Sequence, residues 1–235
     1  AKALKWYIGS VKGIDFGRCC LMVVKYEGDR AAFRNMRRGV SAIYRKHRGV
    51  CLGPEPGRSF AEAKFDFPHL RDYVMDRNIM ADVSETATTW TNLLPLYEDS
   101  LAAIDRAICN TGVASWVGCH ISHSYPTGAS LYFTFGCLQR AGREIEQYLH
   151  IKKAAEDAFM KNGGTLSHHH AVGTEHLPWV EEDVSPTGLK AVQAVKEGLD
   201  PRGIMNPGKI IPPADPLKAW GLSGEALGRF TGSGQ

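Results

Sequence analysis

Three consecutive histidines, His168, His169 and His170, are the part of the sequence best suited to chemistry. They lie in the segment from Asn162 to Gly173, which carries glycines near both ends. An imidazole can donate or accept a proton near neutral pH, and it also binds metal ions. In an extended segment His168 and His170 share one face and His169 takes the other. The run therefore indicates either a reactive site or a histidine-rich surface loop.

A tyrosine in a predicted hairpin is the first candidate partner of the histidines. Residues 113–135 form two strand-like runs around Pro126-Thr127-Gly128, which predicts two antiparallel strands joined by a turn. Tyr132 falls on the face opposite the large apolar residues of its own strand, Leu131, Phe133 and Phe135. Its hydroxyl must then reach solvent or a polar cavity, and His120 of the other strand is placed to line such a cavity.

A metal site is an alternative use of the same histidines. It would need His168 and His170 to join His120 or His123. No cysteine or carboxylate stands at a standard zinc spacing, so no metal is expected.

The elements that precede the hairpin are predicted from apolar spacing and from turn residues. A strand is expected over residues 19–26, followed by a helix over 30–47 that Gly49 ends in a left-handed conformation. Residues 52–67 predict a loop and a short helix, and residues 67–73 an irregular entry into a short strand or a helical turn. Residues 81–87 are expected to carry N-cap residues of a helix that begins near Thr91 and ends before Gly112.

A long helix over 143–161 and a short one over 186–198 follow the hairpin, with many turn-forming residues over 200–210. The chain of 235 residues has 43% hydrophobic content, which is enough for a buried core. Its formal charge of +3 is too small to indicate a nucleic-acid partner, and the basic residues of the 30–47 helix are read as one solvated face. The sequence shows no membrane-length apolar run and no secretory signal, so a soluble protein is expected.

The six cysteines show no CxxC spacing and lie mostly in apolar surroundings. They are expected to be reduced thiols in the core, which favours a reducing compartment.

Three segments resemble, in chain order, the C-terminal half of the alkylglycerone-phosphate synthases. They are CHISHSYPTGASLYF from Cys119, NGGTLSHHHAVG from Asn162 and LDPRGIMNPGKI from Leu199. These synthases form a branch of the FAD-linked oxidase family with the vanillyl-alcohol-oxidase type of fold. The third motif is shared by that wider family, whereas the serine followed by three histidines is typical of the synthase branch. The resemblance covers most of Trp6 to Ile211.

The resemblance implies an α+β fold, in which a ferredoxin-like cap domain has an antiparallel sheet covered by helices. Residues 1–165 would be most of this cap, residues 166–212 the histidine loop and a closing segment that packs on an FAD domain, and residues 213–235 a peripheral tail. No glycine-rich pyrophosphate loop appears in the sequence, so the chain is expected to be the C-terminal part of a longer protein.

The resemblance also implies roles for single residues. Tyr132 would be the acid/base residue and His168, His169 and His170 would be catalytic with it. Arg71, His120 and His123 would bind substrate, and Asn206, Gly208 and Lys209 would contact FAD. Arginine suits a phosphate or carboxylate because its planar fork donates two parallel hydrogen bonds. The sequence departs from the family at Ala171, Thr174 and His120, where glycine, lysine and arginine are usual, which leaves the lipid substrate open.

In the synthases the implied reaction exchanges the acyl group of acyl-dihydroxyacetone phosphate for a fatty alcohol through a flavin N5 adduct. The alternative is an FAD-linked oxidase or dehydrogenase of a 2-hydroxy acid or alcohol. A non-catalytic domain that caps or dimerises a partner is a third possibility. The expected partners are a lipid or other small-molecule substrate, an N-terminal FAD domain, a second copy of the chain and a membrane surface, in a cytoplasmic or, in a eukaryote, peroxisomal location.

Overall fold

The computed structural model describes residues 5–17 and 19–213, and these divide into two compact units, with the division in the chain between Leu70 and Arg71. The boundary expected after residue 165 lies inside the second unit. The expected tail over 213–235 lies, from residue 214 on, outside the described residues.

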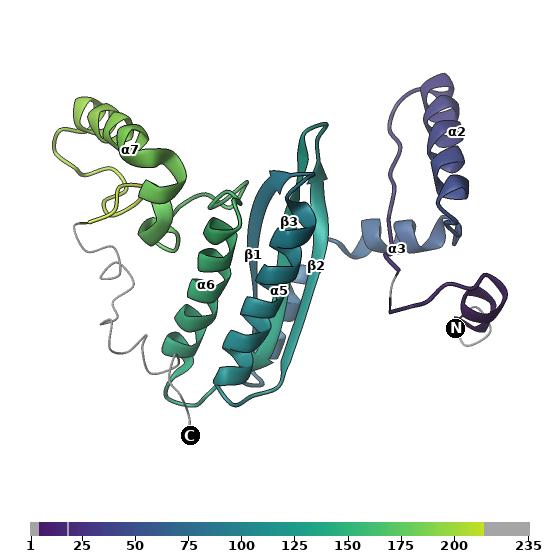
Figure 1. Cartoon of the computed structure of the whole chain (residues 1–235), viewed down its shortest axis with the longest axis horizontal. Helices are drawn as coiled ribbons and strands as arrows, with labels where there is room; N and C mark the ends of the chain where they lie inside the picture. Colours follow the sequence, from purple (N-terminus) through teal and green to yellow (C-terminus); the bar gives the residue numbers. More distant parts are fainter. Residues whose placement is uncertain (1–4, 18, 214–235) are drawn as a thin grey trace. The chain divides into compact units, whose positions relative to one another are not determined.

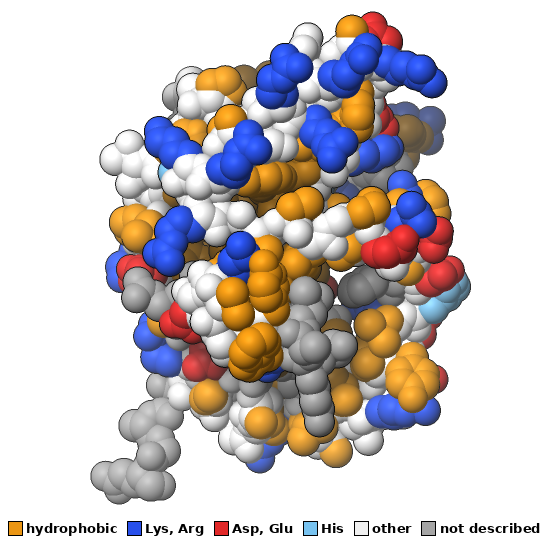
Figure 2. All heavy atoms as spheres, turned by 90° about the vertical axis from the view of Figure 1, so that its right-hand side faces the viewer, with side chains coloured by type: hydrophobic (Ala, Val, Ile, Leu, Met, Phe, Trp, Pro, Cys, Tyr) orange, Lys and Arg blue, Asp and Glu red, His pale blue; other side chains and the backbone are white. Residues whose placement is uncertain are grey.

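The first unit is helical and largely exposed. It contains a π-helical turn η1 (Tyr7–Val11), α2 (Arg30–Lys46) and α3 (Glu55–Ala63), while α4 (Phe67–Met75) begins in it. The carboxylate of Asp29 starts α2 by accepting the N–H groups of Ala31 and Ala32 at 2.8 Å each. Figure 2 shows lysine and arginine side chains gathered over α2, with hydrophobic side chains among them. No residue of α2 is buried, so these basic side chains are solvated.

Two expectations for this unit are wrong. Residues 19–26 form neither a helix nor a strand, although their composition favours a strand. Gly49 does not take the left-handed conformation that ends α2, because Arg48 does so with a φ of 59°.

The second unit is built on a three-stranded antiparallel sheet (Figure 1). Its elements follow the order β1 (Ile79–Thr89), α5 (Leu93–Asn110), β2 (Ser115–Ser124), β3 (Gly128–Leu138) and α6 (Glu144–Lys161). The strand order is β1-β3-β2, so β3 is central and β1 is at an edge. This is the ferredoxin-like pattern without its last strand among the described residues. The α+β prediction is confirmed, and so is the hairpin.

Strand β1 corrects the expectation that residues 81–87 cap a helix. Ser84 and Thr86, two of the three residues expected as caps beside Thr88, are buried in β1. Glu85 between them is buried as well. Residues 67–75 form the helix α4 rather than a strand.

The core lies between one face of the sheet and the helices α5 and α6, which lie side by side on that face in Figure 1. Phe133 and Phe135 of β3 are fully buried there against Ile104 and Ile108 of α5 and Phe159 of α6. The period-two alternation of β3 therefore determines which of its residues reach the core and leaves Tyr132 on the other face.

A smaller apolar cluster holds the C-terminal part of the described chain. It joins Leu166 to Trp179, Val180 and Leu189 from the 3-10 turn η2 (Leu177–Trp179) and from α7 (Val180–Leu199). Helix α7 bends at Ser185, whose φ is 69°, just before Pro186.

All six cysteines are free, but only Cys137 is buried and Cys119 half-buried, so the expectation of core thiols is wrong for the other four. Among the described residues, no helix combines the length and the apolar character that crossing a bilayer requires.

Candidate active site at the edge of strand β1

The histidine segment lies along the free edge of β1, where a ferredoxin-like fold has its fourth strand. Helix α6 ends at Lys161, and the amide N–H of Thr165 donates to the carbonyl of Ala87 at 2.9 Å. The hydroxyl of Thr86 donates to the carbonyl of Thr165 at 2.7 Å. Only glycine fits before Thr165, because a Cβ on Gly164 would lie 2.4 Å from the Thr86 hydroxyl.

Glu85 of β1 holds the histidines themselves. One oxygen of its carboxylate, Oε1, accepts the main-chain N–H groups of His168 and His169 at 2.7 Å and of His170 at 3.0 Å. The hydroxyl of Ser167 donates to the same oxygen at 3.0 Å. The other oxygen, Oε2, lies 3.2 Å from Nδ1 of His169. Glu85 is 1% exposed, so these groups are its surroundings in place of water.

The imidazoles form a continuous cluster of rings with Tyr132. The Tyr132 ring stacks on His169 with centroids 6.1 Å apart, and it meets His170 edge to face at 5.4 Å. Tyr132 also contacts His120, with the two ring centroids 4.8 Å apart. His120 of β2 is paired with Tyr132 of β3 in the register of the sheet. The sheet therefore places Tyr132 between imidazoles from two different parts of the chain.

His123 and Tyr125 extend this cluster toward the surface. The centroid of the His123 ring lies 5.0 Å from that of the His168 ring and 5.1 Å from that of the His169 ring. Nε2 of His168 is 3.0 Å from the Tyr125 hydroxyl, and its Nδ1 is 3.2 Å from Nδ1 of His169. The polar contacts of His168 and of the Glu85 carboxylate therefore meet at one atom, Nδ1 of His169.

The surroundings shift the acidity of the central groups. Burial raises the pKa of Glu85, but the N–H groups of the three histidines and the Ser167 hydroxyl outweigh it, so its pKa is lowered overall. Burial, and after it the carboxylates of Asp82 and Glu85, raise the pKa of Tyr132. Burial also lowers the pKa of His120 and of His170. The resting site thus holds an ionised glutamate and a neutral phenol.

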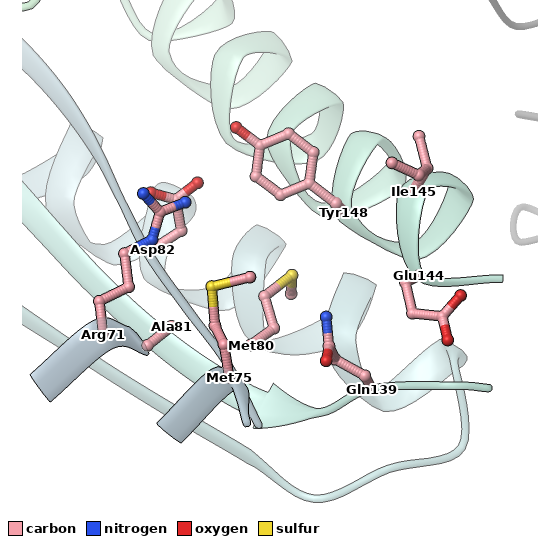
Figure 3. A pocket seen from close by; sticks show the side chains of 9 residues that line it. All are labelled: Arg71, Met75, Met80, Ala81, Asp82, Gln139, Glu144, Ile145 and Tyr148. Atoms are coloured by element: carbon pink, nitrogen blue, oxygen red, sulfur yellow. The ribbon is translucent and has the colours of Figure 1, made fainter. Parts of the chain in front are cut away.

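An open cleft of about 410 Å³ adjoins the histidine segment. Arg71, His170 and Lys209 line it together, with Lys152 and Asp82 among the other charged groups. A second hollow of about 220 Å³ shares Arg71 and Asp82. Figure 3 shows that the Arg71 guanidinium and the Asp82 carboxylate point toward one another, with the Tyr148 hydroxyl of α6 directed to the same region. The cleft offers cations to an anionic ligand but also contains carboxylates.

A buried ionic network forms the floor of the cleft. Nζ of Lys152 in α6 lies 2.6 Å from the Glu175 carboxylate and donates to the carbonyl of Val83 at 2.6 Å. Nε2 of His176 lies 3.5 Å from both Glu156 and Glu175. Burial lowers the pKa of His176, but Glu156 and the carbonyl of Ala171 outweigh it and raise the pKa overall. This network attaches the loop after the histidines to α6.

Three groups of side chains bring potential metal ligands within 4.8 Å of one another. They are His123 with His168 and His169, Glu85 with His169 and His170, and Glu156 with Glu175 and His176. Within the protein, His168, His169 and His176 already have polar partners for their ring nitrogens, so proximity alone does not identify a metal site.

The structure brings together most of the residues expected from the sequence. Tyr132, His120, His123 and the three histidines form one ring cluster, and Arg71 shares a cleft with His170 and Lys209. Asn206 and Gly208 lie on an exposed turn and do not line that cleft. The roles assigned to all these residues stay predictions.

Sequence reasoning missed Glu85 and Tyr125. An acidic residue within a run of small and β-branched residues was the available signal for Glu85. Tyr125 lay beside the predicted turn, where a tyrosine is unremarkable.

Comparisons with known proteins agree with the sequence motifs. Residues 2–210 match a family model described as the C-terminal domain of FAD linked oxidases. The alkyldihydroxyacetonephosphate synthase of Dictyostelium discoideum is 35% identical over 209 residues, which are 89% of this chain and 34% of the synthase. A mitochondrial D-lactate dehydrogenase (cytochrome) of Arabidopsis thaliana is 42% identical over 214 residues, or 88% of this chain and 35% of that protein.

A solved structure of an alkyldihydroxyacetonephosphate synthase is similar to this chain with a TM-score of 0.60 and 28% identity. The match covers 87% of this chain and 34% of the solved one. The chain therefore spans about a third of the length of the proteins it resembles.

Proposed function

This chain belongs to the FAD-linked oxidases, of which it is the C-terminal domain, and on that premise we propose that it supplies the substrate-binding and proton-transfer groups of an alkyldihydroxyacetonephosphate synthase-like enzyme. The reaction would replace the acyl group of acyl-dihydroxyacetone phosphate by a fatty alcohol. The observation that carries the proposal is the placement of Tyr132 between His120 and the paired rings of His169 and His170.

Proton transfer at the substrate carbon fits this arrangement. A neutral phenol is a weak base, and burial together with the carboxylates of Asp82 and Glu85 keeps Tyr132 in that form. An adjacent imidazole is the group that can take the phenolic proton near neutral pH and return it later. We assign this exchange to His169 or His170, whose rings contact Tyr132.

The phosphate of the substrate would bind in the cleft beside His170. Arg71 and Lys209 line this cleft and can supply positive charge to a phosphate. In this proposal Lys209 serves the phosphate rather than FAD, in contrast to the role that the resemblance implies.

FAD is the cofactor of the family, and the residues present suit one edge of it. The cluster of imidazoles offers donors to polar ring atoms of the flavin. When bound, FAD supplies the redox-neutral covalent chemistry that the exchange requires. The remainder of its binding site would come from a part equivalent to the other two thirds of the related proteins.

Oxidation of a 2-hydroxy acid is the second candidate function. The 42% identity to a D-lactate dehydrogenase favours it, and an imidazole can remove a hydroxyl proton during hydride transfer. The same cleft would then bind the carboxylate of the acid through Arg71.

One experiment separates the two functions in the full-length polypeptide with FAD bound. Release of fatty acid and incorporation of labelled fatty alcohol from acyl-dihydroxyacetone phosphate are measured beside bleaching of the flavin by D-lactate. We expect exchange without bleaching. Tyr132→Phe should lower the exchange rate by about 10²- to 10⁴-fold with FAD retained. Bleaching without exchange supports the oxidase, and full exchange in Tyr132→Phe contradicts the role of the tyrosine.

A further inference from the structure

The carboxylate of Glu85 replaces strand pairing at the edge of β1. Three successive main-chain N–H groups, those of His168, His169 and His170, converge on the single oxygen Oε1. A neighbouring strand would direct its successive N–H groups alternately to either side, so three in a row cannot meet one acceptor. The segment is instead curved around an anion, in the manner of a main-chain anion-binding nest.

This curvature determines where the three rings point. The side chains leave the arc in different directions, so that His169 and His170 meet Tyr132 whereas His168 meets His123 and Tyr125. Glu85 also lies directly opposite Tyr132 in the register of β1 and β3. Its second oxygen faces Nδ1 of His169 at 3.2 Å. One carboxylate therefore contacts both the main chain and the ring of the histidine that stacks on Tyr132.

We propose that Glu85 is the positioning residue of this site, which holds the three imidazoles against Tyr132 and places one negative charge beside the phenol. The assignment rests on the proposed function. Glu85 does not act on substrate itself, because it is 1% exposed and its Oε1 is surrounded by four donors. It acts through His169, His170 and Tyr132.

The test compares Glu85→Gln with Glu85→Ala and with the control Thr86→Val in the full-length FAD-bound protein. Glutamine keeps the size and one carbonyl oxygen for the arc but removes the charge, whereas alanine removes both. Thr86 is the adjacent buried residue of β1 and also hydrogen-bonds the histidine segment, but it carries no charge. Thr86→Val therefore reports loss of attachment alone.

Turnover should separate these variants. Glu85→Gln is expected to lower kcat by about 10²-fold, the order expected for misplaced catalytic groups, with little change in KM. Thr86→Val should keep most of kcat. Glu85→Gln with wild-type kcat would overturn the proposal, and so would an equal loss of kcat in Thr86→Val.

The pH dependence gives a readout that a merely structural role would not change. The charged or titratable groups around Tyr132 are Glu85 and Asp82 of β1, His120 of β2, and His169 and His170 of the histidine segment. Removing the Glu85 charge should lower the pKa of Tyr132, because an adjacent anion opposes ionisation of a phenol. The alkaline limb of the turnover profile should then move to lower pH in Glu85→Gln and stay in place in Thr86→Val.

Two measurements need no activity and separate failure of this proposal from failure of the proposed function. The first is the phenolate absorbance of Tyr132, obtained by subtracting the pH titration of Tyr132→Phe in each background. The second is amide hydrogen exchange of residues 167–170, which should quicken in Glu85→Ala. If the wild-type protein performs no acyl exchange but both signals change as expected, the function is wrong and Glu85 still positions the histidines. If neither signal changes, the proposal about Glu85 is wrong.

Discussion

The two faces of the three-stranded sheet differ in what covers them. On one face Leu131, Phe133 and Phe135 of β3 are buried under α5 and α6. On the other face Tyr132 lies among His120, Glu85 and the histidine segment. Consecutive residues of one strand thus serve a hydrophobic core and a polar, titratable cluster. The apolar face of the sheet can therefore stabilise this unit while the face that carries Tyr132 is available for chemistry.

The largest expected effect is on the free energy of unfolding, to which the buried face of the sheet should contribute most. Phe133→Ala should lower the free energy of unfolding by about 3–5 kcal/mol, because Phe133 is fully buried between the helices and the sheet. Tyr132→Phe, one residue away on the opposite face, should cost less than about 1 kcal/mol. Urea denaturation followed by circular dichroism measures both. Similar losses in the two variants would mean that the faces do not differ as described.

A smaller effect is expected where the histidine segment leaves the core. In Gly164→Ala the new Cβ would lie 2.4 Å from the Thr86 hydroxyl and 2.7 Å from Cδ1 of Leu96, so the segment must shift. Overpacking of this kind costs about 1–3 kcal/mol, and turnover should fall as the histidines move.

Gly198→Ala is the matched control, because nothing lies within 4 Å of a Cβ at that position in α7. It should keep the wild-type stability or gain about 0.5–1 kcal/mol from helix propensity. Denaturation curves that coincide for Gly164→Ala and Gly198→Ala would show that the close approach is not needed.

The smallest effect concerns acid. The pKa of Glu85 is lowered in the folded state below the value of 4.5 usual for the free side chain. Its contribution to stability is therefore present above about pH 4.5 and is lost as the pH falls through the lowered folded pKa. In Glu85→Gln this part of the acid dependence should disappear, as measured by the free energy of unfolding between pH 6 and pH 3. Glu182→Gln, a change at an exposed residue of α7, should retain it.

Elements with a strong repeating pattern could be predicted from the sequence. In the helices α2, α5 and α6 the apolar residues recur at helical spacing. In the hairpin of β2 and β3 they alternate, and the turn between the two strands sets their register. The placement of Tyr132 away from the core followed from the alternation of β3 alone.

Elements whose stability comes from distant residues could not be predicted. The sequence of β1 is polar at Ser84, Glu85 and Thr86, which does not suggest a buried strand. These side chains can be buried because they hydrogen-bond to Lys152 of α6 and to the histidine segment, about 70 to 85 residues away in the chain. Residues 19–26 show the reverse case: they have strand-forming side chains, but no strand pairs with them among the described residues.

The sequence likewise predicted some residues of the candidate site and missed others. Residue type pointed to Tyr132 and the histidines, whereas Glu85 is defined by a convergence of main-chain N–H groups that only the folded backbone creates. The four exposed cysteines were misjudged because apolar neighbours in the sequence do not determine burial in space.

The irregular segment at the edge of β1 also bears on how such a domain can diverge. Paired strands share a two-residue period, so an insertion or deletion in one of them turns its side chains to the wrong face. The histidine segment is attached to β1 through one carboxylate and a few threonine contacts, and it has no such period to preserve. Its length and composition after His170 can therefore change without altering the register of the sheet. Relatives that act on different substrates could in this way retain one scaffold while replacing a single loop.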